Sequence, residues 1–495
     1  MINQNLILAR AYEDALGPDI SSNDRPSFHL TPRIGWMNDP NGFSYYRGQY
    51  HLFYQYNPYD VVWDAMHWGH AVSHDLLHWT YLPCALAPDE SYDSFGVFSG
   101  SAIELKDGRQ LLMYTGVRKE GHDRDSRTIQ VQCLAVGDGL DYRKYEGNPV
   151  LDERCLPEGM SRYDFRDPKI WREDDGSYRC VAGTCDKDRI GSLLLFSSKD
   201  GFSWKYESIL ARNDGSLGSM WECPDFFRLD GKDVVLISPE NMLSKDFEYP
   251  DGNGTVCLIG RFDEKQKKFI PEADQAVDCG IDFYAPQTIL TPDGRRVMIG
   301  WMQNWGNCRQ TRSEELMWFG QMSLPRELSI RNGRLYQQPI RELALYRSRK
   351  VEYRDVLIDG EKTLENIEGR RLELDLRIRP ADPGNIYREF TLRFAQNDRY
   401  YTQLSYRPHE SLLKIDRKFS GPRQAYIHQR TARIDRRGGE LTLQLILDRF
   451  SIEVFVNGGE KVMTATVLTD PDAKGISFHA DGAVIADVVK YSLFA

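Results

Sequence analysis

The sequence has no apolar stretch that could cross a membrane as a helix, because no window approaches the roughly 18 apolar residues that a span requires. Its first 20 residues contain the short apolar run Leu6–Leu8. They carry no basic segment and no longer apolar core, so they do not resemble a secretory signal. We therefore expect no membrane partner and a cytoplasmic location.

The sequence also lacks the cysteine spacing of a disulfide framework or a zinc site. Its nine cysteines are odd in number and include no CxxC pair, which favours reduced thiols. Histidines gather between His67 and His78, but their spacing fits neither one helix face nor a zinc finger. We expect no metal and no cofactor.

An excess of positive charge is missing as well. The net charge is −10 and the pI about 5.6, which argues against a nucleic-acid partner. The balance is uneven, because residues 370–437 carry 16 Lys and Arg against 8 Asp and Glu, a local +8, so the remainder carries about −18. This basic segment is either a solvated sheet face or a contact with the acidic part of a second copy, which leaves a homo-oligomer open.

The chain is long enough for two domains. From about Phe28 to Ile330 it shows short apolar runs separated by Gly, Asp and Asn, as in all-β proteins. Hairpin-like turns recur there at intervals of 60, 68, 55 and 63 residues, and their glycines are Gly48, Gly108, Gly176, Gly231 and Gly294. A strand-like run follows each turn, and a weaker second turn signal gives four antiparallel strands per unit. Five such units predict a five-bladed β-propeller.

The position nine residues before each turn glycine is equivalent in the five units. These positions are Asp39, Ser99, Asp167, Glu222 and Ala285. The first strand of every propeller blade lines the central axis, so equivalent positions converge at one end of the channel. Three of the five are carboxylates with a proline close behind, and we predict that these three acids meet.

The remaining segments have a different character. Residues 1–27 are expected to be an extension with a short helix at 5–16, ahead of a propeller at 28–330. Residues 331–348 are expected to be a linker with a short helix near Pro339 to Leu345. Residues 349–495 alternate apolar and polar positions, as in Leu372–Arg379, and turn at Asn457–Gly458, which predicts a C-terminal β-sandwich.

The stretch Gly35–Gly42 sets the carboxylate of Asp39 beside an amide and an indole, as sugar sites do. Two carboxylates about 5 Å apart are the arrangement of retaining glycosidases, in which one attacks the anomeric carbon and the other protonates the leaving oxygen. Glu222 lies between Trp221 and Cys223, in a drier setting than Asp39, so we expect Asp39 to be the ionised nucleophile and Glu222 the acid/base. Arg166 is expected to keep Asp167 ionised.

Six motifs taken together resemble glycoside hydrolase family 32, the β-fructofuranosidases. They occur in the family's order from near Phe28 to the second half of the propeller: Trp36–Gly42, Phe53–Pro58, Phe98–Ser101, Phe165–Pro168, Trp221–Pro224 and Asp282–Gln287. The resemblance implies a five-bladed propeller followed by a β-sandwich, in agreement with the repeat.

The resemblance also implies roles for single residues. Asp39 would be the nucleophile, Asp167 the transition-state stabiliser and Glu222 the acid/base. Arg166 and Asp167 would hold fructose hydroxyls, and Cys223 would tune the neighbouring acid. The pocket would be lined by Asn38, Gln55, Trp63, Phe98, Ser99 and Trp301.

The expected activity is that of a retaining, exo-acting β-fructofuranosidase. Its substrate would be a small sugar: sucrose, sucrose 6-phosphate or a short fructo-oligosaccharide. A fructan exohydrolase, a fructosyltransferase on the same scaffold and a non-catalytic carbohydrate-binding homologue remain alternatives. The sequence does not choose among the sugars or fix the oligomeric state.

Overall fold

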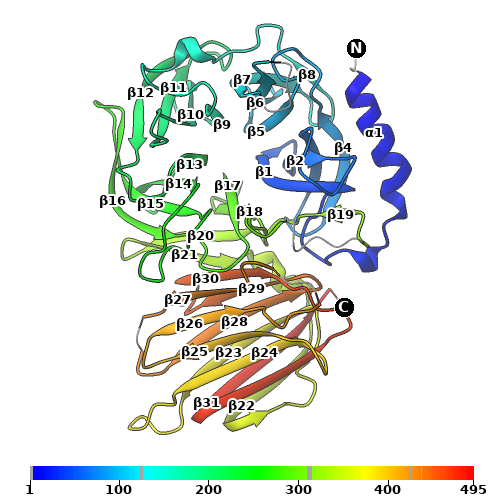
Figure 1. Ribbon diagram of the computed structural model, residues 1–495, viewed down its shortest axis with the longest axis vertical. Helices are drawn as coiled ribbons and strands as arrows, with labels where there is room; N and C mark the ends of the chain where they lie inside the picture. Colours follow the sequence, from blue (N-terminus) through cyan, green and yellow to red (C-terminus); the bar gives the residue numbers. More distant parts are fainter. Residues whose placement is uncertain (1–3, 122–125, 309–314, 423–424, 436, 495) are drawn as a thin grey trace.

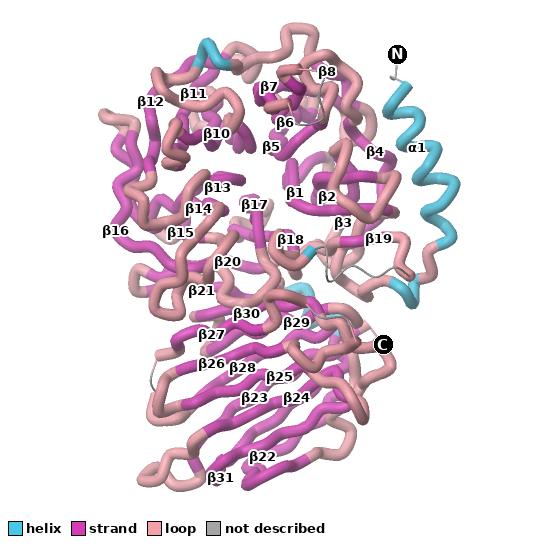
Figure 2. The backbone as a smooth tube through the Cα atoms, in the orientation of Figure 1, coloured by secondary structure: helices cyan, strands magenta, loops and turns pink. Residues whose placement is uncertain are grey.

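The structure is a computed structural model that describes residues 4–121, 126–308, 315–422, 425–435 and 437–494. A ring of five small sheets stands above a second, layered β-domain (Figure 1). In these ranges most residues lie in strands, and helix is confined to one long segment and a few short turns (Figure 2). Within the described ranges no helix is long and apolar enough to span a membrane.

Each blade of the ring contains four antiparallel strands, with the first strand in sequence innermost. Blade 1 contains β1 (Gly35–Tyr46), β2 (Gln49–Asn57), β3 (His67–Ser73) and β4 (Trp79–Leu86). Blade 2 contains β5 (Gly96–Glu104), β6 (Gln110–Lys119), β7 (Thr128–Gly137) and β8 (Tyr142–Lys144). Blade 3 contains β9 (Arg166–Arg172), β10 (Tyr178–Cys185), β11 (Gly191–Ser198) and β12 (Trp204–Arg212). Blade 4 contains β13 (Trp221–Leu229), β14 (Lys232–Pro239), β15 (Val256–Asp263) and β16 (Lys268–Ala276). Blade 5 contains β17 (Tyr284–Leu290), β18 (Arg296–Trp301), β20 (Arg326–Arg331) and β21 (Arg334–Pro339).

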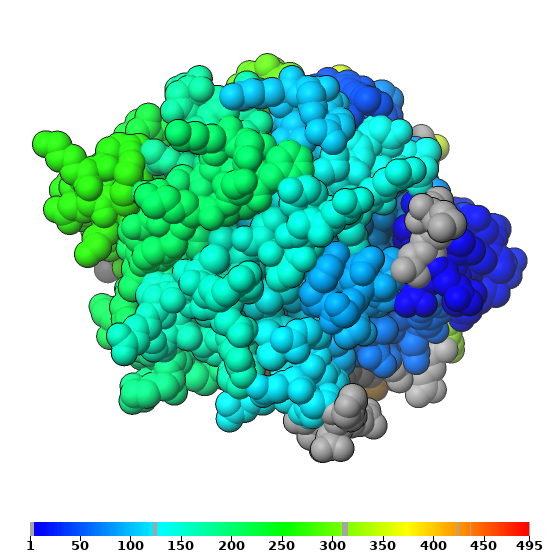
Figure 3. Space-filling model, turned by 90° about the horizontal axis from the view of Figure 1, so that it is seen from above, coloured from blue at the N-terminus to red at the C-terminus, as the bar shows by residue number. Residues whose placement is uncertain are grey.

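The five-bladed propeller is therefore confirmed. Each of the five counted glycines lies in the turn between the first and second strands of a blade, with φ between 78° and 84°. A side chain at that φ would be strained, so the turn favours glycine. Blades 2 to 4 pack side by side without a break in the view from above, with the N-terminal helix at one edge (Figure 3).

A β-bulge interrupts the inner strand of every blade near the position nine residues before the glycine. The pairing register between the first and second strands shifts between Met37 and Pro40 in blade 1 and between Phe98 and Gly100 in blade 2. The other blades show the same shift. Bulges bend a strand and re-aim its side chains, and they are common beside active sites. We infer that the bulge turns the side chains near the position nine residues before the glycine toward the channel.

The end of blade 5 differs from the expectation of a linker at 331–348. Residues 334–339 form β21, which pairs with β20 from Arg331↔Arg334 to Arg326↔Pro339. The linker interpretation is wrong for these residues, because the turn Asn332–Gly333 joins two strands of one blade. A 3-10 helix, η4 (Arg341–Tyr346), follows where a short helix was expected. A two-residue strand, β19 (Trp318–Phe319), pairs in parallel with β1 and links the last blade to the first.

The C-terminal strands form two layers that share two long strands. The first half of β31 (Gly475–Leu493) pairs with β24 (Glu389–Gln396), and its second half pairs with β23 (Leu372–Pro380). β22 (Arg347–Lys362) follows β31 along most of its length. One layer continues through β25 (Thr402–Arg407), β26 (Leu412–Asp416) and β27 (Gln429–Arg433), and the other through β28 (Leu441–Asp448), β29 (Ser451–Val456) and β30 (Lys461–Thr466). Side chains of the two layers meet in the core, as predicted for a sandwich.

The N-terminal helix α1 (Gln4–Leu16) confirms the helix expected at 5–16. It packs on blade 1 through the buried Leu6 and Ala9. Glu13 is buried in the same face and accepts the backbone N–H of Cys84 at 3.0 Å. Burial raises the pKa of Glu13 to about 7. Short 3-10 helices η1 (Gly17–Asp19) and η2 (Ser22–Asp24) lead into the propeller, and η3 (Glu153–Cys155) lies between blades 2 and 3.

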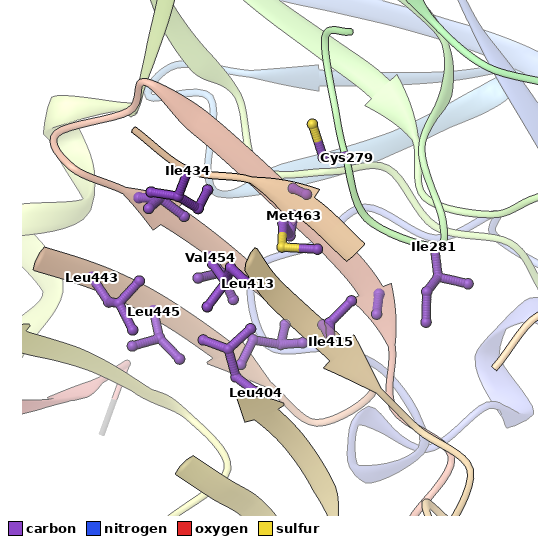
Figure 4. Packing of buried hydrophobic residues seen from close by; sticks show 14 of the residues in the cluster. Cys279, Ile281, Leu404, Leu413, Ile415, Ile434, Leu443, Leu445, Val454 and Met463 are labelled. Carbon is purple, nitrogen blue, oxygen red and sulfur yellow. The ribbon is translucent and has the colours of Figure 1, made fainter. Parts of the chain in front are cut away.

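The two domains share one core and one buried ionic network. Cys279 and Ile281, from the segment before β17, lie beside Met463 and the apolar residues of both sandwich layers (Figure 4). Arg326 of β20 is fully buried and donates to Glu453 at 2.6 Å and to Asp278 at 3.0 Å. Because Glu453 lies in β29, this guanidinium ties the propeller to the sandwich.

Replacing Arg326 by Met should lower the free energy of unfolding by about 3 to 5 kcal/mol, because it leaves the buried Asp278 without its cation and the buried Glu453 with His29 alone. Urea denaturation at neutral pH measures the change. Arg331→Met, at an exposed residue of the same strand, is the matched control and should change little. Equal effects of the two changes would contradict a special role of the buried network.

Candidate active site

The three predicted acids come from the inner strands of three blades and meet in the channel. Asp39 lies in β1, Asp167 in β9 and Glu222 in β13. The thiol of Cys223 joins two of them: its Sγ is 3.4 Å from Asp39 Oδ2 and 3.6 Å from Asp167 Oδ2. Asp167 and Cys223 have φ of 63° and 46°, so the backbone is in the left-handed region at these bulges.

Three donors surround the carboxylate of Asp39. Ser99 Oγ donates to Oδ2 at 2.7 Å, and the Cys223 thiol donates to the same oxygen. Asn38 Nδ2 donates to Oδ1 at 3.1 Å, while its Oδ1 accepts from Trp36 Nε1 at 2.8 Å. Burial raises the pKa of Asp39, the three donors lower it, and the charge of Glu222 raises it further. The donors all favour the ionised form that a nucleophile needs.

Asp167 is held by a side chain of blade 2 and by the backbone of blade 4. Its N–H donates to Thr115 Oγ1 at 2.9 Å, and its Oδ2 accepts the N–H of Cys223 at 2.9 Å. Burial raises its pKa to about 7 although Arg166 lowers it, because Glu222 and Asp39 add to the effect of burial.

This pKa contradicts the expectation that Arg166 keeps Asp167 ionised. Arg166 Nε lies 4.0 Å from Asp167 but 3.0 Å from Glu222 Oε1, and the other guanidinium nitrogens lie near Glu240 and Asp164. One guanidinium shared among four carboxylates does not outweigh the burial of Asp167. The neighbours in sequence are not the closest partners in space.

Glu222 has two donors of different kinds. Arg166 Nε donates to Oε1, and the hydroxyl of Tyr284 donates to Oε2 at 2.6 Å. Burial would lower the pKa of Arg166, but Glu222 and the other nearby carboxylates raise it well above its ordinary value. The carboxyl of Glu222 therefore faces a permanent cation on one side and a hydroxyl on the other.

Aromatic rings form one wall of the site, and they differ in exposure. Trp63 is 39% exposed and lies edge-on to Phe98, with ring centroids 5.8 Å apart. Both can face a ligand. Trp301 is fully buried against Trp36 and Trp305. Its ring packs under the wall, and the expectation that it lines the pocket is wrong.

Gln55 and Trp301 belong to a ring of residues that sequence reasoning did not recognise. Counting seven residues forward from each turn glycine gives Gln55, Thr115, Gly183, Ser238 and Trp301. Gln55 donates to Val97 O of blade 2 at 2.9 Å, and Ser238 Oγ accepts the N–H of Ala285 of blade 5 at 3.1 Å. Thr115 holds Asp167 in the same way. Each of these side chains positions the bulge of the next blade.

Two further functional residues were missed. Tyr284 lies in a quoted motif, but only the fold shows its hydroxyl against Glu222. Glu240, at the end of β14, pairs with Arg166 at 3.1 Å and with Arg189 at 2.7 Å. Burial and the charge of Glu222 raise the pKa of Glu240. No spacing signal in the sequence distinguishes it from an ordinary surface acid.

The histidines between His67 and His78 have separate partners. His67 contacts Ala65 O, His70 contacts His51 at 3.0 Å, and His78 contacts Asp75 at 2.8 Å. Among the described residues, no three His, Cys, Asp or Glu side chains are arranged to hold a metal ion. All nine cysteines lie in the described ranges and are free thiols.

The arrangement suits cleavage of a glycosidic bond. A carboxylate held by three donors faces a second acid that is held by a cation and a hydroxyl. A third carboxylate, that of Asp167, has a raised pKa and is joined to the first through Cys223. These are the groups that a two-carboxylate glycosidase uses for attack, proton transfer and hydroxyl binding.

Comparison with known proteins agrees with this chemistry. The model of the glycosyl hydrolases family 32 N-terminal domain matches residues 29–339, and the family 32 C-terminal model matches residues 342–493. The chain is 35% identical over 493 residues to the raffinose invertase of Escherichia coli, covering 97% of each protein. It is 34% identical over 470 residues to the sucrose-6-phosphate hydrolase of Escherichia coli, covering 93% of this chain and 92% of that protein.

Solved structures give the same result. The β-fructofuranosidase of Bombyx mori superposes with a TM-score of 0.83 at 32% identity, covering 100% of this chain and 99% of that one. The sucrose-6-phosphate hydrolase of Lactobacillus gasseri superposes with a TM-score of 0.83 at 28% identity, covering 99% and 96%.

The fold and the three acids thus define a glycoside hydrolase of the invertase type. The chain belongs to glycosyl hydrolase family 32.

Replacing Asp167 by Asn should stabilise the protein at alkaline pH while impairing catalysis. A folded-state pKa of about 7 against an ordinary value near 3.8 means that the folded state binds more protons than the unfolded state between these values, so stability falls as pH rises through this window. Asn removes this cost, which is at most about 4 kcal/mol. It keeps an acceptor for the N–H of Cys223.

Melting temperatures at several pH values measure the effect. The gain should be largest above pH 7 and nearly vanish at about pH 4, where Asp167 is protonated in the folded state. Asp398→Asn, in an exposed loop, is the control and should show no such trend. A gain of the same size at both ends of the range would contradict the raised pKa.

Proposed function

We propose that the protein is a retaining, exo-acting β-fructofuranosidase. It would hydrolyse terminal β-D-fructofuranosyl residues of sucrose, sucrose 6-phosphate or short fructo-oligosaccharides. The observation that carries the proposal is the meeting of Asp39, Asp167 and Glu222 around Cys223 and Arg166. The names of the two relatives, raffinose invertase and sucrose-6-phosphate hydrolase, support fructose as the released sugar.

In the first step, Asp39 Oδ attacks the anomeric carbon of the fructosyl group, and the bond to the glycosidic oxygen breaks. Glu222 gives its proton to that oxygen, so the aglycone leaves as a neutral alcohol. Ser99, Asn38 and Cys223 hold the attacking carboxylate in place. The product is a fructosyl ester of Asp39 and an ionised Glu222.

In the second step, Glu222 takes a proton from a water molecule, and the water oxygen displaces Asp39 from the anomeric carbon. Fructose leaves with its configuration retained, and both carboxyls return to their starting states. Arg166 contacts Glu222 in the charged form that this step requires. Asp167 would accept hydrogen bonds from hydroxyls of the sugar, and in its ionised form its carboxylate would stabilise the positive charge that develops on the ring in the transition state.

Asp39→Asn should reduce kcat on sucrose on the order of 10⁴-fold or more, because the amide cannot act as the nucleophile. Binding should change little, since Asn can still accept from Ser99. Release of fructose, followed for the unaltered enzyme and the variant, measures the loss, and calorimetry measures binding. Asp398→Asn should retain full activity. Substantial turnover by Asp39→Asn would disprove the nucleophile assignment.

Glu222→Ala should reduce turnover of sucrose by roughly 10² to 10⁴-fold, because the leaving oxygen loses its proton donor. A fructoside with an activated leaving group needs less protonation and should lose less. Azide can attack the fructosyl intermediate without a general base, so it should restore turnover of the activated substrate and yield β-fructosyl azide. If azide had no effect on either substrate, Glu222 would not be the acid/base.

A further inference from the structure

A second cavity lies at the end of the propeller channel away from the acids. Its volume is about 720 Å³. All five inner strands line it near their turns, at 43–45, 102–104, 169–172, 225–228 and 288–290. Asp39 and Tyr45 are six residues apart in β1, which corresponds to roughly 20 Å along a strand.

A layer of buried polar side chains separates this cavity from the catalytic acids. Gln287 Nε2 donates to Gly100 O at 2.7 Å, and its Oε1 accepts the N–H of Phe43. Lys169 Nζ donates to Thr288 O at 2.8 Å and pairs with Asp225 at 3.0 Å. The cavity is therefore a separate space and not the floor of the active site.

The walls of the cavity combine aromatic rings with polar groups. Six aromatic residues line it: Phe43, Tyr45, Trp171, Phe226, Phe227 and Phe262. Tyr45 is 40% exposed, so its ring is open to a ligand at the mouth. Aromatic faces beside hydrogen-bonding groups are the surfaces on which sugar rings stack, and a space of this size holds a small ligand.

Two buried polar atoms on this wall have no hydrogen-bond partner within the described part of the chain. They are Oδ1 of Asp225 and Nε of Arg296. Asp225 is fully buried, and its other oxygen already accepts the N–H of Thr288 at 2.7 Å. A buried polar atom without a partner is costly. Asp225 can accept and Arg296 can donate, and hydroxyl groups can satisfy both.

The charges of the lining argue against a free anion. Five cations and six acids line the cavity, a formal balance of −1: Lys169, Arg172, Arg179, Arg228 and Arg296 against Glu104, Glu173, Asp174, Asp225, Asp233 and Glu264. An anion would face the orphan carboxylate oxygen of Asp225 at close range. A neutral polyol carries both donors and acceptors and meets no such repulsion.

We propose that this cavity is a second, non-catalytic carbohydrate-binding site. It would bind a neutral mono- or disaccharide, stacked on the aromatic wall and hydrogen-bonded to Asp225 and Arg296. Because the polar layer separates it from the acids, occupancy would not require fructose to reach the catalytic pocket. The affinity should be low, since the mouth is open and only a few polar groups converge.

Calorimetric titration of Asp39→Asn protein with sucrose tests the proposal. We expect two classes of sites, of which the weaker belongs to the far cavity. Adding Tyr45→Ala and Arg296→Gln should weaken that class about tenfold or more, because a stacking face and a donor are lost. Adding Arg331→Gln, at an exposed residue outside the cavity, should leave both classes unchanged.

A single class of sites that does not depend on Tyr45 and Arg296, or a weak class that persists in the Tyr45→Ala/Arg296→Gln background, would overturn the proposal. If the stronger class were missing while the weaker one still depended on Tyr45 and Arg296, the far site would stand and the proposed catalytic function would fail. Crystals of Asp39→Asn protein soaked in sucrose give a second readout that needs no cavity variant. Sugar at the far mouth supports the site, and its absence there at saturating sucrose overturns it.

Discussion

The free edges of the five inner strands set the main constraint on this molecule. Each first strand pairs with its own blade on one side. On the other side its backbone groups face the channel without a strand partner among the described strands, except at Gly35 and Trp36 of β1, which pair with β19. Buried backbone groups need partners. Side chains from other blades supply them: Asn41 accepts the N–H of Gly100, Ser101 Oγ donates to Pro168 O, and Gln287 bridges blades 1 and 2. The channel is closed by these bonds, and the acids stand directly above them.

The same need for partners explains why an acid can be held at the catalytic level. The carboxylate of Asp167 accepts the N–H of Cys223, and therefore joins blade 3 to blade 4 as Asn41 joins blade 1 to blade 2. Its own N–H is satisfied by Thr115. The side chain of Asp167 thus links two blades and also supplies a carboxylate to the site. The bulges supply the change of direction that brings Asp39, Asp167 and Glu222 together at this level.

The five blades could be predicted from the sequence because the first turn of every blade has a φ near 80°, which favours glycine, and these glycines recur at regular intervals. The register of nine then identified the acids. The same counting at seven residues before the glycine gives Asn41, Ser101, Lys169 and Gln287, which close the channel, with Pro224 in blade 4. Residue spacing could not predict the raised pKa of Asp167, the burial of Trp301 or the contact of Tyr284 with Glu222. Each of these depends on side chains from other parts of the fold. Residues 334–339 were misassigned because a polar outer strand resembles a linker.

Burial has opposite net effects on acid pKa values at the domain joint, around His29, and in the propeller channel, around Asp39 and Asp167. At the sandwich, burial would lower the pKa of His29, but Asp448 and Glu453 raise it to about 9. Burial would raise the pKa values of Asp448 and Glu453. His29 outweighs this effect for Asp448, and Arg326 and His29 outweigh it for Glu453, so both pKa values are lowered. Each of these three groups has a buried counter-charge. At the channel, burial dominates and the pKa values of Asp39 and Asp167 are raised. The donors around Asp39 and Arg166 beside Asp167 offset only part of this burial, so both acids destabilise the fold when they are ionised.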